Sequence, residues 1–424
     1  MFEATTPDGK SIAVPGRRET VVLLAGLMAL NAFAIDAMIP ALPAIGADLG
    51  VAEENRRQLV VIAYMLGFGV GQLFWGPLAD RFGRKPILGV GVALYAGFAL
   101  LCGVASSFEL LIAGRVAMGA SAAVTRVLVV AMVRDLFHGE AMAKVMSLVF
   151  MTFMLVPVLA PNLGQAILLF APWRAIFLLL AGYGLVMWLW SFARLPETLH
   201  PEFRRPLEAR AIARAAAVAA SDRLSLGYTL AMTAIFGGLT AYIASIQQIV
   251  FDTYRAPQLI GLVFAMVAAP MALASWANSR VVGRFGLRRV GHAGLIGFVA
   301  ITLAHAVVAH VLSEPLWLFA ALMGLTLMAF AFTTSNFATL AMTNMAAIAG
   351  TASSVQGVAG TIGGALIGLA IGQAFDGSQR PFLIGFAACG IAGLVIVLVT
   401  ERGRLFAAID LGEPAEGPHD EALT

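Results

Sequence analysis

The feature that most constrains the fold of this chain is a series of twelve apolar runs, most of them about 20 residues long. A helix of that length rises about 30 Å, which is the thickness of the hydrocarbon core of a bilayer. Charged residues make up only 12% of the chain, against about 25% in a soluble domain. The runs cover approximately residues 20–40, 58–79, 87–105, 109–133, 144–170, 174–193, 224–251, 258–283, 289–312, 315–342, 346–375 and 380–400. The sequence therefore predicts an all-α membrane protein with twelve transmembrane helices.

A charged segment interrupts this pattern near the middle of the chain. It covers residues 194–223, contains three prolines and has no run long enough to span a bilayer. The loops DRFGRK, from residue 80, and GRFGLR, from residue 283, are alike and begin 203 residues apart. Repeated halves are common in secondary transporters. We expect a six-helix half at 1–193, a cytoplasmic linker at 194–223, a second six-helix half at 224–400 and a tail at 401–424.

The arginines and lysines indicate how the helices are oriented. If the N-terminus is cytoplasmic, 20 of the 27 basic residues fall in cytoplasmic segments. The opposite side holds five, namely Arg56, Arg57, Arg174, Arg255 and Arg380. Membrane proteins keep Lys and Arg in their cytoplasmic loops. Both termini and the linker are therefore expected in the cytoplasm. No cleavable signal peptide is expected, because the first 19 residues are polar.

Several motifs resemble those of known transporters. GPLADRFGRKP, at residues 76–86 after the second run, resembles the signature of the major facilitator superfamily. LIAGRVAMGA in the fourth run, LVPVLAPNLG in the fifth and DAMIPALP in the first are similar to its drug/proton antiporter branch. LGFGVGQLFWGPLADRFGRKP, AMVRDLF, LPETL and IAGTASSVQGVAGTIGGALIG resemble the Bcr/CflA subfamily, and the resemblance covers roughly residues 20–400.

This resemblance implies proton-coupled efflux of amphiphilic small molecules of drug size, such as amphenicols, by a monomer in the bacterial inner membrane. The proton gradient would supply the energy. Export of a physiological metabolite or siderophore-like compound, an uncoupled facilitator and a non-transporting receptor are the alternatives.

Other classes of function find no support in the sequence. The chain has no GxxxxGK[ST] nucleotide loop, so no cofactor is expected. It has no hydrolase elbow, and we expect no enzymatic activity. Cys102 and Cys389 lie far apart in predicted spans, which favours packing over a disulfide or a metal site. The basic residues lie in short loops beside the spans, which favours lipid over nucleic acid as a partner.

Asp36 is an acidic residue deep in the first run. A charge is costly there unless it has a partner, a proton or water. At 1.5 Å per residue, Asp36 lies about 24 Å along its span and Arg115 about 9 Å from the outer end of the fourth. These depths coincide in a core of about 30 Å. Arg115 also matches the arginine of the family's motif in that span. We expect Asp36 to carry the proton and Arg115 to communicate with it, directly or through water. A static ion pair is the alternative.

Arg126 follows Arg115 by 11 residues, about three turns, so both lie on one face of the span. The related subfamily often has an arginine at the position of Val130 instead. Arg126 could bind an anionic or hydrogen-bonding substrate, pair with Asp36 after a rearrangement, or extend to the cytoplasmic interface. In the fifth run, Ala160 replaces the family's usual glycine, which leaves room for altered gating.

The family resemblance assigns a gating role to the loop motif. Its residues are Gly76, Asp80, Arg81, Gly83 and Arg84, with Asp135 as the expected partner of Arg84. Basic residues held on one side for topology are the simpler alternative. Asp80 and Gly83 contribute nothing to topology, so they favour gating.

Polar and large apolar residues inside the spans are candidates for a substrate cavity. Such a lining suits large, partly apolar ligands, although any one polar group could instead make an interhelical hydrogen bond. The candidates are Asn31, Phe68, Met118, Thr125, Arg126, Met154, Tyr242, Gln248, Asn336 and Phe337.

Overall fold

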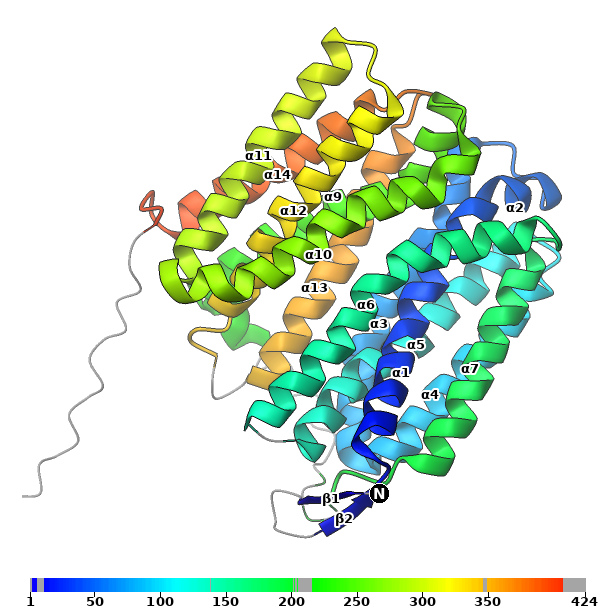
Figure 1. Ribbon diagram of the computed structural model, residues 1–424, viewed down its shortest axis with the longest axis vertical. Helices are drawn as coiled ribbons and strands as arrows, with labels where there is room; N and C mark the ends of the chain where they lie inside the picture. The colour runs from blue at the N-terminus through cyan, green and yellow to red at the C-terminus, as the bar shows by residue number, and fades with distance from the viewer. Residues whose placement is uncertain are drawn as a thin grey trace, which may run out of the picture.

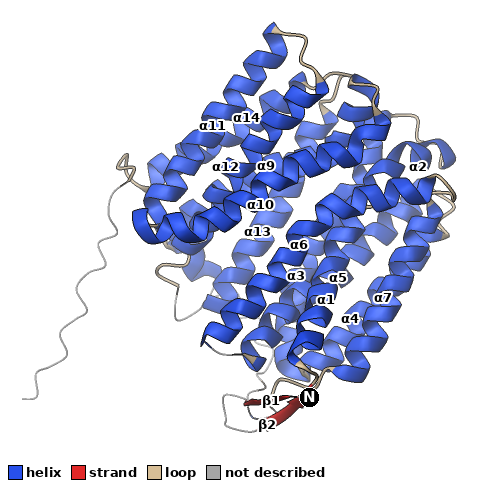
Figure 2. Cartoon of the chain, viewed as in Figure 1, coloured by secondary structure: helices blue, strands red, loops and turns tan. Residues whose placement is uncertain are grey.

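The computed structural model describes residues 2–5, 11–137, 139–200, 202, 204, 216–345 and 349–406. Within these, side chains are described except at 2–5, 11–14, 140, 143, 147, 150–155 and 349–351. The described residues form a bundle of long helices, shown in Figure 1 and Figure 2. The prediction of an all-helical membrane fold is confirmed.

Twelve long helices are present in the described part of the chain. They are α1 (Arg17–Asp36), α3 (Leu59–Phe82), α4 (Arg84–Gly103), α5 (Phe108–Leu136), α6 (Gly139–Leu168), α7 (Arg174–Arg194), α9 (Arg223–Gln248), α10 (Ile260–Phe285), α11 (Leu287–Val311), α12 (Leu316–Leu340), α13 (Ala349–Gln373) and α14 (Arg380–Thr400). Among the described residues, 11 helical segments are long and apolar enough to cross a membrane, and α6 contributes a shorter apolar segment, Val156–Leu168.

Short elements occupy the connections. They are η1 (Ile39–Ala41), α2 (Leu42–Asp48), η2 (Glu54–Gln58), the π-helix η4 (Ile249–Thr253) and η5 (Pro257–Leu259). Ahead of α1, strands β1 (Phe2–Thr5) and β2 (Ser11–Val14) form an antiparallel hairpin with Phe2 opposite Val14. The sequence analysis did not anticipate this hairpin, although Pro-Asp-Gly between the strands is a turn signal.

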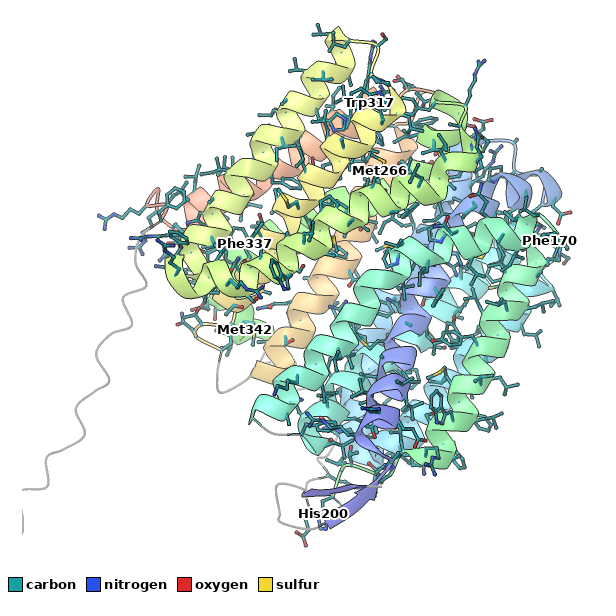
Figure 3. The ribbon with its side chains drawn as sticks, viewed as in Figure 1. Phe170, His200, Met266, Trp317, Phe337 and Met342 are labelled. Carbon is teal, nitrogen blue, oxygen red and sulfur yellow. The ribbon has the colours of Figure 1, made fainter. Side chains whose placement is uncertain are left out.

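The helices contact one another in two groups. Helices α1 to α7 pack among themselves, and α9 to α14 pack among themselves, while the groups meet chiefly through α3 with α13 and α6 with α10. Successive long helices run in opposite directions (Figure 1). We call the end with the turn between α3 and α4, where Arg84 lies, the basic end, and the end with η2 the opposite end. Phe170 and Trp317 protrude at the opposite end (Figure 3).

Glycines allow α3 and α5 to approach closely. A Cβ added at Gly67 or Gly71 of α3 would overlap the carbonyl of Val116 or Ala120 on α5, and one at Gly119 would overlap the carbonyl of Tyr64. Small residues bring membrane helices together in this way, because lipid supplies no hydrophobic drive for association. This contact positions the face of α5 that carries Arg115 and Arg126.

Amide side chains join the two groups at the opposite end. Asn55 donates to the carbonyls of Gln373 and Phe375 at 3.1 and 3.0 Å. Gln248 donates to Asn55 at 2.8 Å, and Gln58 donates to Gln248. We call Asn55, Gln58, Gln248 and Gln373 the amide latch.

The two groups separate toward the basic end. Among the described residues, the hydrogen bond between the groups that lies nearest to that end joins Gln72 to Thr361, at 3.2 Å, midway along α3. Figure 1 shows α6 and α10 diverging from the opposite end toward the basic end. The structure therefore describes a conformation that is held shut at the opposite end.

Candidate functional site

Asp36 lies where the first membrane helix breaks. Pro40 is the second residue of η1 and Pro43 the second residue of α2, and neither proline can supply the backbone N–H that would continue α1. A broken helix at membrane depth is tolerated only inside protein or beside water. The Asp36 side chain is only 4% exposed. The break thus holds a carboxylate in the interior, where its charge is costly.

Asp36 faces the second helix group. The element that follows it, η1, contacts α9, and Tyr242 of α9 is close enough to Asp36 to interact electrostatically. The Tyr242 hydroxyl is buried and has no hydrogen-bond partner among the described residues, and its ring packs on Phe264 with centroids 5.7 Å apart. A movement between the groups would therefore change the surroundings of the Asp36 carboxyl.

Arg115 binds two backbone carbonyls. It is fully buried, and its Nε donates to Val60 of α3 at 2.8 Å while one terminal nitrogen donates to Ala34 of α1 at 3.0 Å. Its guanidinium lies over the Tyr64 ring at 4.4 Å. Within the described residues, no ion pair or hydrogen bond joins Arg115 to Asp36. Communication between the two stays a prediction, and the direct contacts of Arg115 make it a clamp on α1, α3 and α5.

The neighbouring cavity candidates of the first group are already engaged. Asn31 accepts a hydrogen bond from Tyr64 at 3.0 Å, and Tyr64 stacks on Phe68 at 6.4 Å. Met118 touches the Arg115 guanidinium at 3.7 Å, and Thr125 donates to the carbonyl of Ala122 at 2.9 Å. The side chain of Met154 lies outside the described residues.

The candidates of the second group also have partners. Gln248 belongs to the amide latch. Asn336 donates to Asn278 at 2.8 Å. Phe337, labelled in Figure 3, packs on Tyr228 at 4.9 Å. The structure therefore assigns interhelical contacts to Gln248, Asn336 and Phe337. Two candidates differ, because the Tyr242 hydroxyl has no described partner and the Arg126 side chain is exposed.

The loop motif forms an ion-pair cluster at the basic end. Arg84 lies 2.8 Å from Asp135 and 3.4 Å from Asp80. Gly83 connects α3 to α4 with φ +103°, a conformation that favours glycine. Gly76 packs on Val127 of α5, and the Arg81 guanidinium lies over the Phe82 ring at 5.2 Å. The cluster ties the ends of α3, α4 and α5 together.

Two residues beyond α7 complete this cluster, and the sequence analysis missed them. The Glu197 carboxylate accepts hydrogen bonds from the backbone N–H groups of Arg84 at 2.8 Å and Lys85 at 3.3 Å, where a carboxylate stabilises the start of α4. Thr198 donates to Asp135 at 2.9 Å. Their stretch, LPETL, was noted only as a family resemblance, because no spacing rule connects it to a loop more than 100 residues earlier.

The cluster supports a prediction about gating. Asp135→Asn and Asp80→Asn should each lower transport about tenfold, since loosening the cluster by about 1.4 kcal/mol shifts a conformational equilibrium by that factor. Asp135 should have the larger effect, because its contact with Arg84 is shorter. Lys85→Gln is the control, because it removes a charge from the same turn but keeps the backbone N–H that binds Glu197, and the Lys85 ammonium lies over the Phe192 ring, outside the cluster. The measurement is the initial transport rate of each variant and of wild type at matched expression. Wild-type rates in all three variants would leave topology as the motif's only role.

The second group carries two buried polar clusters that the sequence analysis also missed. His305 of α11 lies 2.8 Å from Glu314, and both side chains are almost fully buried. At the basic end, the Tyr228 hydroxyl binds Glu401 and lies 3.0 Å from His292. Tyr228, His292 and Glu401 come from helix ends that are distant in sequence, whereas His305 and Glu314 are nine residues apart at the end of α11 and in the loop that follows it. Within the part of the chain that the structure describes, no group of His, Cys, Asp and Glu could hold a metal ion.

The long helices in two groups, the carboxylate at a helix break and the ion-pair turn define a secondary transporter of the membrane. A family model for the Major Facilitator Superfamily matches residues 24–368, and the chain belongs to that family. It is a transporter and not an enzyme.

Curated relatives support this assignment. The chain is 36% identical over 267 residues to a bicyclomycin resistance protein homolog of Haemophilus influenzae, covering 63% of this chain and 67% of that one. It is 28% identical over 397 residues to the multidrug resistance protein MdtL of Escherichia coli, covering 90% and 95%.

Two solved structures share the fold. A D-xylose-proton symporter superposes with a TM-score of 0.69 at 14% identity, covering 91% of this chain and 98% of its own. The human organic anion transporter MFSD10 superposes with a TM-score of 0.63 at 20% identity, covering 90% and 100%.

Proposed function

We propose that this protein exports amphiphilic small molecules across the bacterial inner membrane in exchange for protons. The observation that carries the proposal is Asp36, a buried carboxyl at a helix break that faces the second helix group. A buried ionisable group in a membrane span is a functional candidate by default. The curated relatives named for bicyclomycin and multidrug resistance support drug-like molecules as the substrates.

The proposed cycle uses the two ends of the bundle in turn. With the basic end in the cytoplasm, the conformation held by the amide latch is open inward. Asp36 releases its proton to the cytoplasm in this state, and the substrate binds. The latch then opens as the basic end closes, Asp36 takes up a proton from outside, and the substrate leaves. Two discrete states of the same bundle are sufficient for this exchange.

Vesicle flux tests the proposal directly. Purified protein in liposomes is given an imposed pH gradient, and uptake of a radiolabelled amphenicol is followed with and without the gradient. The proposal expects accumulation against the amphenicol gradient that collapses when an ionophore removes the proton gradient. Equilibration to equal concentrations would favour an uncoupled facilitator. No flux for any compound in a panel would favour a metabolite exporter or a receptor.

The orientation is tested by labelling cysteines in intact cells. Arg204→Cys lies in the linker and Ser106→Cys in the loop between α4 and α5 at the opposite end, and both positions are exposed. Cys102 and Cys389 are buried, so the native thiols give little background. We expect an impermeant maleimide to label Ser106→Cys from outside and to label Arg204→Cys only after lysis. The reverse pattern would overturn the assignment of the basic end to the cytoplasm.

A further inference from the structure

Arg126 has an exposed side chain on a helix face that is otherwise packed. Ala122 and Val129, about one turn before and after it on α5, are fully buried, as is Thr125 beside it. The Arg126 side chain is nevertheless exposed. It therefore leaves the packed interior of the first helix group and enters an open space.

The contacts of α5 show which way Arg126 points. Val124, which packs on Gly91 of α4, is turned about 160° away from Arg126 around the helix. Arg115 is turned only about 20° away and reaches the carbonyl of Ala34 in α1. The neighbour on the other flank is α3, which also contacts α13 of the second group. Arg126 therefore faces the space between the two groups.

Arg126 has no partner for its charge among the described residues. Arg84, Arg174 and Arg194 each lie beside a carboxylate. No such pair forms at Arg126, and no described charged group is close enough to influence it electrostatically. A guanidinium stays charged at all physiological pH values, and an unpaired charge away from bulk water is costly. Its position requires either water or an anion.

Asp36 cannot supply that anion. Arg126 lies 11 residues beyond Arg115, which is about 16 Å along α5 toward the basic end. Arg115 is held at the level of Ala34, two residues before Asp36. The axial separation exceeds what an extended arginine and an aspartate can bridge. Pairing between Arg126 and Asp36 would need α1 to slide by at least one turn against the helix that clamps it.

We propose that Arg126 binds the anionic group of the substrate, so that amphiphiles carrying a carboxylate are among the exported molecules. This inference rests on the proposed export function. In the described conformation the Arg126 side chain is exposed, so water can solvate its charge. When that end closes, a substrate carboxylate replaces the water with a bidentate, charge-assisted hydrogen bond. A neutral substrate would leave the charge unpaired in the closed site.

A matched pair of dyes tests this inference. Rhodamine 110 carries a free carboxylate, and rhodamine 123 is its methyl ester. Affinities for the purified full-length protein are measured by fluorescence polarisation. We expect wild type to bind rhodamine 110 at least about tenfold more tightly than the ester, which is the discrimination of about one charge-assisted hydrogen bond. Arg126→Gln should lower the affinity for rhodamine 110 to that for the ester, and it should leave the affinity for the ester unchanged. Arg126→Lys should retain part of the preference.

Arg134→Gln is the matched control, because Arg134 is an exposed arginine on the same helix. It should leave both affinities unchanged. Three outcomes would overturn the inference: the wild type binds both dyes with equal affinity, it does not bind rhodamine 110, or Arg126→Gln lowers the affinity for both dyes equally. If Arg126→Gln does not fold, the wild-type comparison and Arg126→Lys decide. Proton-driven export of rhodamine 123 without any carboxylate preference would overturn the inference and leave the export proposal intact. Transport of both dyes without any response to protons would overturn the export proposal instead.

Discussion

Asp36→Asn should abolish accumulation against a gradient while the protein still folds and binds substrate. A gradient of two pH units can drive about 100-fold accumulation in a one-to-one exchange of a neutral substrate, since each unit corresponds to about a factor of ten. Asparagine keeps the size and polarity of the residue but cannot change its charge. The variant should therefore equilibrate the substrate to a ratio of about 1 in vesicles where wild type concentrates it.

The controls separate loss of coupling from loss of structure. Asp36→Glu keeps a titratable carboxyl and should retain part of the accumulation. Asp48→Asn removes a carboxylate at the opposite end, where Asp48 pairs with Arg174 at the surface, and should leave accumulation near the wild-type value. Accumulation by Asp36→Asn at the wild-type level would remove Asp36 from the coupling mechanism.

Arg115→Leu should be strongly destabilising, more so than the substitutions at Asp36, Asp80, Arg126 and Asp135. It removes the donors to the carbonyls of Val60 and Ala34 and leaves both buried in the protein interior. Hydrogen bonds to a charged group contribute about 1.5–3 kcal/mol each, so the free energy of unfolding should fall by about 3 kcal/mol or more. Arg115→Lys should recover only part of this, because an ammonium lacks the planar fork that reaches both carbonyls.

Arg126→Leu is the control for this prediction, since Arg126 makes no described hydrogen bond. Thermal unfolding in detergent, followed by fluorescence-detected gel filtration, should show a large decrease for Arg115→Leu and little change for Arg126→Leu. Similar unfolding temperatures for Arg115→Leu and wild type would contradict the role of Arg115 as a clamp on α1, α3 and α5.

The positions of the helices could be predicted from the sequence because the bilayer sets their length. The apolar run at 109–133 corresponds to α5 at Phe108–Leu136, and the run at 380–400 to α14 at Arg380–Thr400. A span must hide its backbone polar groups within itself, so an apolar run of this length has few alternatives to a helix. The break after Asp36 could also be anticipated from Pro40 and Pro43.

Side-chain partners could not be predicted in the same way. Depth along a span placed Asp36 and Arg115 at one level, but depth says nothing about the direction in which each side chain leaves its helix. The structure turns Arg115 toward Tyr64 and the carbonyls of α1 and α3, and turns Asp36 toward α9. Glu197 was missed for a related reason, since its contact with the start of α4 exists only once α7 has returned to the basic end.

Proton release from the purified protein tests the central claim most directly. Protein in weakly buffered detergent solution is mixed with a substrate identified by the flux experiment, and the released protons are followed with a pH-sensitive dye. The account predicts release by wild type on substrate addition and none by Asp36→Asn at a substrate concentration where both are saturated. Undiminished release by Asp36→Asn would contradict the account and leave the carboxyl at the helix break as a structural residue.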